Sequence, residues 1–79
     1  MRAGMKFRDV IAILVRNGFR LDRHRGSHRQ FEGWAAGKRR PITIAGNDGE
    51  DVPSWTFGSI VRQSGLPRTL FRYWFDADG

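Results

Sequence analysis

Residues 19–44 read FRLDRHRGSHRQFEGWAAGKRRPITI, and they divide into three short runs of apolar and polar residues separated by glycine-containing turns. The runs are residues 19–22, 29–34 and 41–44, and in the first two an apolar side chain alternates with a charged or polar one. A period of two residues is typical of strands that bury one face. The stretch therefore predicts a three-stranded antiparallel sheet, with RHRGSH at the tip of its first hairpin and WAAGKRR as its second turn.

An amphipathic helix is predicted on each side of this sheet. Residues 7–17 carry apolar side chains at helical i, i+3, i+4 and i+7 spacing, and Gly18 stands where a helix-ending glycine belongs. The second helix begins with Ser54 as its N-cap and ends at Gly65. Gly58 inside that helix predicts a close approach by a neighbouring element, because glycine there costs about 1 kcal/mol relative to alanine.

The order of these elements predicts an α+β fold with the order α-β-β-β-α. Both helices are expected on one face of the sheet, which leaves the other face open to solvent or a ligand. Pro67 opens a short C-terminal helical tail, RTLFRYWF. The 79 residues form one domain, 1–79, with a core of about residues 5–71 and a tail at 72–79.

Composition points to a folded protein of the cytoplasm. The chain is 39% hydrophobic and 13% aromatic, which argues against disorder. It has no cysteine, so it holds neither a disulfide nor a thiolate metal site. The only continuous apolar run, VIAILV at residues 10–15, is too short for a membrane span. We therefore expect cytoplasmic localisation and no membrane partner.

The positive charge is concentrated in one third of the chain. Residues 16–40 hold eight basic and two acidic residues, so they account for the entire net charge of +6. Arginine's planar guanidinium matches the oxygens of a phosphate, and a local cluster of arginines with interspersed aromatics is typical of nucleic-acid binding. A solvated basic face without a partner is the alternative.

His28 is the candidate catalytic residue. It follows Gly26 and Ser27 at the hairpin turn, among the densest arginines. A histidine exchanges protons near neutral pH, and neighbouring guanidiniums would hold a phosphodiester, so RNA would be cleaved without a metal by attack of its 2′-hydroxyl. The alternative is an exposed turn histidine that only contacts phosphate or solvent. Gly26 supplies a backbone angle that glycine adopts readily, and Ser27 hydrogen-bonds the turn backbone.

His24 is a possible second acid/base group, and its role depends on the turn. A three-residue loop of residues 25–27 would place His24 opposite His28 on one sheet face. A two-residue turn at residues 25–26 would place Arg23 opposite His28 instead. The sequence leaves both geometries open.

Further candidates contact RNA without reacting. The predicted phosphate-binding residues are Arg23, Arg25, Arg29, Lys38 and Arg39. Trp34, Trp55, Tyr73 and Trp74 are either base-stacking residues or core residues. No metal is expected, because the chain lacks thiols and a third ligand at suitable spacing, and eight basic residues would repel a dication. No nucleotide-binding loop and no cofactor are expected.

Two segments resemble the HicA-type toxins. Residues 17–31, NGFRLDRHRGSHRQF, carry a glycine ending the first helix, an arginine, then Gly-Ser-His and an aromatic residue, and residues 56–66, TFGSIVRQSGL, are similar to that family's second helix. The similarity covers roughly residues 5–71, beginning beside Met5, which leaves the translation start at Met1 or Met5 open.

The resemblance implies a fold like that of double-stranded RNA-binding domains (dsRBDs) and a metal-independent endoribonuclease toxin. Such a toxin cleaves mRNA with one histidine, blocks translation and is neutralised by a HicB-like antitoxin. His28 matches the catalytic histidine, Gly26 and Ser27 its turn, and Arg23 the preceding arginine, whereas Arg25 and Lys38 are proposed from charge alone. A non-catalytic dsRBD-like RNA-binding module is the alternative function, and a DNA-binding or structural partner protein is a third.

Overall fold

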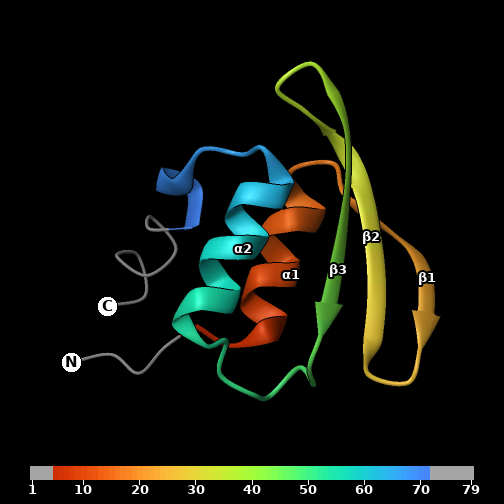
Figure 1. Cartoon of the computed structure of the whole chain (residues 1–79), viewed down its shortest axis with the longest axis vertical. Helices are drawn as coiled ribbons and strands as arrows, with labels where there is room; N and C mark the ends of the chain where they lie inside the picture. Colours follow the sequence, from red (N-terminus) through yellow and green to blue (C-terminus); the bar gives the residue numbers. More distant parts are fainter. Residues whose placement is uncertain (1–4, 72–79) are drawn as a thin grey trace.

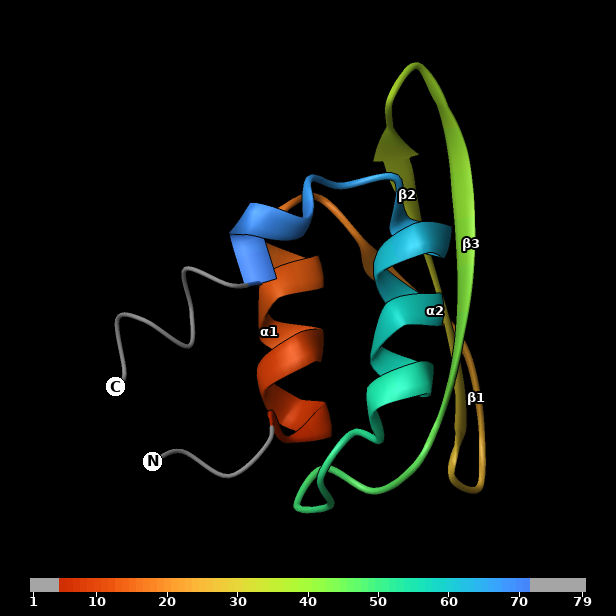
Figure 2. The ribbon, with the colours of Figure 1, turned by 60° about the vertical axis from the view of Figure 1, so that its left-hand side comes forward.

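The computed structural model describes residues 5–71, which form a three-stranded sheet and two principal helices. The elements are α1 (Phe7–Arg16), β1 (Arg20–Arg25), β2 (His28–Ala35), β3 (Lys38–Ala45) and α2 (Ser54–Ser64), followed by helical residues 68–71 (Figure 1). The strands are antiparallel in the order β1-β2-β3. Figure 2 shows both helices on one side of the sheet. The predicted α+β fold and its α-β-β-β-α order are confirmed, and the arrangement is consistent with a dsRBD-like fold. Residues 72–79 of the predicted tail lie outside the described residues.

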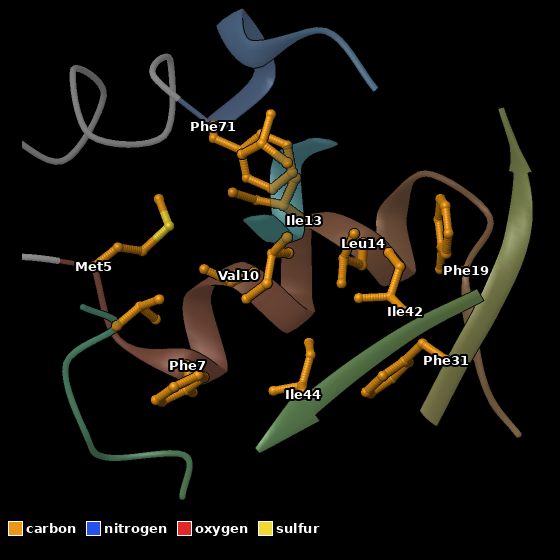
Figure 3. Close-up of a cluster of buried hydrophobic side chains, with 13 residues drawn as sticks. Met5, Phe7, Val10, Ile13, Leu14, Phe19, Phe31, Ile42, Ile44 and Phe71 are labelled. Carbon is orange, nitrogen blue, oxygen red and sulfur yellow. The ribbon is translucent and has the colours of Figure 1, made fainter. Parts of the chain in front are cut away.

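The core lies between the helices and one face of the sheet. Phe31 of β2 and Ile42 of β3 are Cα partners, and both side chains are buried. Figure 3 shows them with Ile44 facing α1. The buried hydrophobic residues are Met5, Phe7, Val10, Ile13, Leu14, Phe19, Phe31, Ile42, Ile44, Val52, Ile60, Val61 and Phe71. Burying large apolar side chains contributes about 1.5–3 kcal/mol each, so this cluster is the main source of stability.

Gly33 of β2 allows the ring of Phe19 to lie directly on the sheet backbone. A Cβ atom at Gly33 would be 2.7 Å from Cγ of Phe19, closer than real Cβ contacts come. Phe19 is buried as expected, but Leu21, its predicted partner in alternation, is 49% exposed. The pairing register shifts between Leu21 and Arg23, which marks a bulge at Asp22 on this edge strand. All six residues of β1 are exposed, so the strand contributes little to the core.

The second hairpin begins its return strand earlier than predicted. β3 starts at Lys38, three residues before Pro41, because a tight turn at Ala36 and Gly37 pairs Ala35 with Lys38. Both turn residues have positive φ, 53° and 81°, as a type I′ turn requires. Proline is tolerated within β3 because this strand lies at the edge of the sheet, where a missing N–H need not break a ladder.

The helix ends agree with the sequence in most respects. α1 ends at Arg16, and Gly18 has a φ of 88°; Gly65 closes α2 in the left-handed conformation with a φ of 69°. The predicted N-cap is wrong, because Ser54 is the first helical residue and Pro53, in extended conformation, occupies the cap position without a side-chain hydrogen bond.

The expected close approach at Gly58 is also wrong. A Cβ atom at this position would meet nothing within 4 Å, so no neighbouring element requires the glycine. Gly58 therefore weakens α2 without a packing gain among the described residues.

We expect two glycine substitutions to change stability in opposite directions. Gly58→Ala should raise the free energy of unfolding by about 1 kcal/mol, since alanine favours the helix. Gly33→Ala should lower it by roughly 1–3 kcal/mol, because the new methyl group would collide with the Phe19 ring. Urea unfolding followed by circular dichroism measures both values, and a Gly33→Ala chain as stable as the Gly58→Ala chain would contradict the packing described.

Candidate functional site

The turn between β1 and β2 consists of Gly26 and Ser27, with Arg25 directly opposite His28. Gly26 has a φ of 59°, and a glycine with positive φ at the first central position is the mark of a type II′ turn. Both turn geometries considered from the sequence are therefore wrong, because neither placed the glycine first in a two-residue turn. The residue after β3 also stabilises this turn, since the Gly46 N–H donates to the Ser27 carbonyl over 3.1 Å.

The two histidines lie on opposite faces of the sheet. Phe31 is buried on the inner face, so His28, an odd number of residues away on β2, faces outward. His24 pairs with Arg29, the next residue of β2, and so belongs to the inner side. Its Nε2 lies 2.8 Å from the carbonyl oxygen of Gly26. His24 therefore does not form an acid/base pair with His28 across the outer face.

His28 lines a shallow concavity on the outer face. The concavity measures about 220 Å³ and is lined by Arg23, Arg25, His28, Arg29, Gln30 and Thr43. Within residues 5–71 the His28 ring makes no hydrogen bond, and the guanidiniums of Arg23 and Arg25 form no ion pair with any described residue. Three side chains that can donate to a phosphate thus surround one open space.

Arg29, a predicted phosphate-binding residue, has its guanidinium engaged within the protein. Its side chain is only 15% exposed and pairs with Asp48, Nη1 to Oδ1 at 2.7 Å. Its Nη2 donates to the Gly46 carbonyl over 3.0 Å. The Asp48 carbonyl in turn accepts the Arg8 N–H at the start of α1 over 3.1 Å. Arg29 therefore anchors the hairpin tip to the loop that caps α1.

Lys38 and Arg39 lie at the far end of the sheet from His28. Arg39 pairs with Trp34 in the register, and Trp34 lies six positions after His28 on β2, about 20 Å at roughly 3.3 Å per residue. Arg39 donates through Nε, at 3.1 Å, and Nη2 to the Glu32 carboxylate. These hydrogen bonds, with the charges of Arg39 and Arg20, lower the pKa of Glu32 despite opposing desolvation, so the carboxylate stays ionised and offsets the charge of Arg39 near neutral pH.

Two of the four aromatic candidates are exposed, and the other two lie outside the described residues. Trp34 is 72% exposed on β2, and Trp55 is 80% exposed in the first turn of α2. Neither is a core residue. Tyr73 and Trp74 are not among residues 5–71.

Gln30 and Thr43 are site residues that the sequence reasoning missed. They are Cα partners on neighbouring strands, and both line the concavity beside His28. Gln30 could be placed at the site from the sequence, because it lies two residues after His28 and side chains two apart on a strand share one face. Thr43 has no such local signal, because only the β2–β3 register brings it to the site.

The described residues offer neither a cluster of metal ligands nor a membrane-spanning helix. Residues 5–71 contain no group of three or more His, Cys, Asp or Glu side chains positioned to hold a metal ion. In the same residues, no helix has the length and apolar character needed to cross a membrane.

Comparison with known proteins gives one family. A sequence model described as the HicA toxin of bacterial toxin-antitoxin systems matches residues 7–66. This match runs from the first residue of α1 past the end of α2 and includes the hairpin that carries His28. A search of curated protein sequences finds no match.

We expect Arg29 and Arg25 to contribute very differently to the free energy of unfolding. Arg29→Ala should lower the free energy of unfolding by about 1.5–3 kcal/mol, because it removes a charged hydrogen bond and leaves Gly46 without its donor. Arg25→Ala is the matched control, and as an exposed arginine without an ion pair it should change stability by no more than about 0.5 kcal/mol. Urea unfolding measures both, and equal effects of the two substitutions would show that Arg29 does not anchor the hairpin.

Proposed function

Because the chain belongs to the HicA toxin family of bacterial toxin–antitoxin systems, we propose that it is an endoribonuclease that cleaves mRNA and thereby blocks translation. The observation that carries this proposal is the position of His28. Its ring faces solvent on the open side of the sheet, in one concavity with two guanidiniums that have no ion pair among the described residues. A proton-transfer group beside unpaired cations is what cleavage of a phosphodiester requires.

The proposed reaction uses the 2′-hydroxyl of the RNA as its nucleophile. His28 accepts the proton of the 2′-hydroxyl while that oxygen attacks the adjacent phosphorus, and the bond from phosphorus to the 5′-oxygen breaks. Water or the protonated His28 returns a proton to the leaving 5′-oxygen, which yields a 2′,3′-cyclic phosphate and a 5′-hydroxyl end. The reaction needs neither a metal nor a cofactor, because the nucleophile belongs to the substrate.

Arg23 and Arg25 serve the same reaction through charge. Both belong to β1 and face outward with His28, Arg25 as its direct partner across the hairpin. Their guanidiniums bind the phosphate and stabilise the negative charge that develops on its oxygens. Gly26 and Ser27 form the turn that sets this pairing, so they support catalysis by position.

The proposed protein partner is a HicB-like antitoxin acting in the cytoplasm. It would neutralise the toxin by covering the concavity around His28, either with an acidic surface or with a segment inserted among the arginines. The charge supports this, since Arg23 and Arg25 present unpaired cations that a carboxylate-bearing partner would match.

Replacing His28 tests the catalytic role. The purified wild-type chain should cleave an mRNA in the presence of a chelator, and His28→Ala should lower the cleavage rate by roughly 10²–10⁴-fold, the usual contribution of a general acid/base. His24→Ala is the matched control, because His24 lies on the inner side, and it should keep most of the activity. Gel analysis of a labelled transcript gives the rates, and induced expression gives the corresponding arrest of growth.

Two results would contradict the proposal. Undiminished cleavage by His28→Ala would remove the histidine from the mechanism. Binding of RNA by the wild-type chain without any cleavage would favour the non-catalytic dsRBD-like module instead.

Co-expression tests the antitoxin. The open reading frame beside the gene for this chain should encode the partner, and its co-expression should restore growth of a host that the toxin arrests. The two proteins should also purify together, with weaker association after Arg23→Glu and Arg25→Glu reverse the charge at the concavity. Full toxicity in the presence of that neighbour would contradict the assignment of the partner.

A further inference from the structure

We propose that the substrate is single-stranded RNA lying along the outer face of the sheet from His28 to Trp34, where one base stacks on the exposed indole. This inference rests on the proposed function of His28 and extends it by naming the form of the substrate and a second point of contact.

Trp34 and His28 share one face and one strand. Both occupy even positions of β2, and Phe31 and Gly33, at odd positions, are buried on the opposite, inner face. Trp34 is 72% exposed and no helix of the described residues covers its face of the sheet. About 20 Å of open strand joins the two residues, at roughly 3.3 Å per residue. A chain of several nucleotides can therefore lie between them.

The end of the sheet that carries Trp34 projects beyond β1. Arg20, the first residue of β1, pairs with Glu32, so the part of β2 after Glu32 pairs only with β3. Figure 1 shows the hairpin of β2 and β3 extending past β1. The indole thus stands on a two-stranded arm with Arg39 as its direct partner across the hairpin. The exposed indole offers a stacking surface at this end of the sheet.

Charge favours a polyanion on this face. The paired residues of the outer face include four arginines against one carboxylate, Glu32. On the outer face Arg20, Arg23 and Arg25 continue the positive surface from His28 along β1 toward Glu32. Glu32 is neutralised by Arg39, so it leaves no free negative charge on the path. A negatively charged backbone therefore meets unpaired cations at the His28 end of the path and along β1.

The exposed indole selects single strands over duplexes. An unstacked base offers its π-face to an aromatic side chain, whereas the bases of a duplex are already stacked and paired. A duplex would be held by its phosphates alone and would gain nothing from Trp34.

The test uses His28→Ala, so that bound RNA stays intact, and an unstructured RNA of about ten nucleotides, a length within the range that single-strand-binding surfaces cover. Trp34→Ala in this background should weaken binding by roughly 5- to 100-fold, as expected for the loss of one stacked base. Trp34→Phe should restore most of the affinity. Trp55→Ala is the matched control, because Trp55 is similarly exposed, 80% against 72%, but belongs to α2, and it should change affinity by no more than about twofold. Fluorescence anisotropy of labelled RNA measures all four chains.

A second readout follows the indole itself. In a chain with Trp55→Phe and Trp74→Phe, the remaining tryptophan fluorescence comes from Trp34, and single-stranded RNA should quench it more strongly than a duplex of the same sequence. The inference is overturned if Trp34→Ala binds single-stranded RNA as tightly as its parent, if the indole is not quenched, or if the duplex binds equally well. Failure of the proposed function is read separately, from cleavage by wild type and His28→Ala, and does not enter these binding measurements.

Discussion

The pairing of Phe31 with Ile42 across β2 and β3 determines which face of the sheet is buried. Both side chains lie under the helices, where burial of each contributes about 1.5–3 kcal/mol. Since side chains alternate along a strand, a slip of one residue would turn this apolar pair to solvent and His28 to the core. The packing that stabilises the domain therefore also holds His28, Gln30 and Trp34 on the open face. Stability and the candidate site depend on the same register.

The arginines of residues 16–40 fall into two groups, those in ion pairs with described residues and those without. Arg29 and Arg39 are engaged in ion pairs with Asp48 and Glu32, whereas Arg23 and Arg25 form no ion pair with the described residues. Arg29 connects the hairpin to the loop that caps α1, so the position of His28 depends on the contact of its neighbour Arg29 with Asp48, nineteen residues further along the chain. Net charge alone therefore overestimates the number of cations available to a phosphate.

Much of the fold was predictable because its signals are local. The helical spacing of apolar residues in 7–17, the glycines at 18 and 65 and the alternation around Phe31 each depend on a few neighbouring residues, and each is confirmed. The errors have local causes too. Residue type favours Ser54 as the cap although Pro53 occupies that position, and the helix cost of glycine predicts a packing role for Gly58 that no neighbouring element requires.

Local sequence patterns are enough to predict the order of the elements, the place of His28 beside a hairpin turn and the family, because periodicity, glycine positions and motif spacing are properties of adjacent residues. The folded structure was needed to establish that Arg25 stands opposite His28, that His24 lies on the inner side and that Thr43 lines the concavity. A glycine can occupy more than one position in a turn, and each position gives a different register. Which one forms depends on the packing of the whole sheet against the helices, and that packing joins residues far apart in the chain.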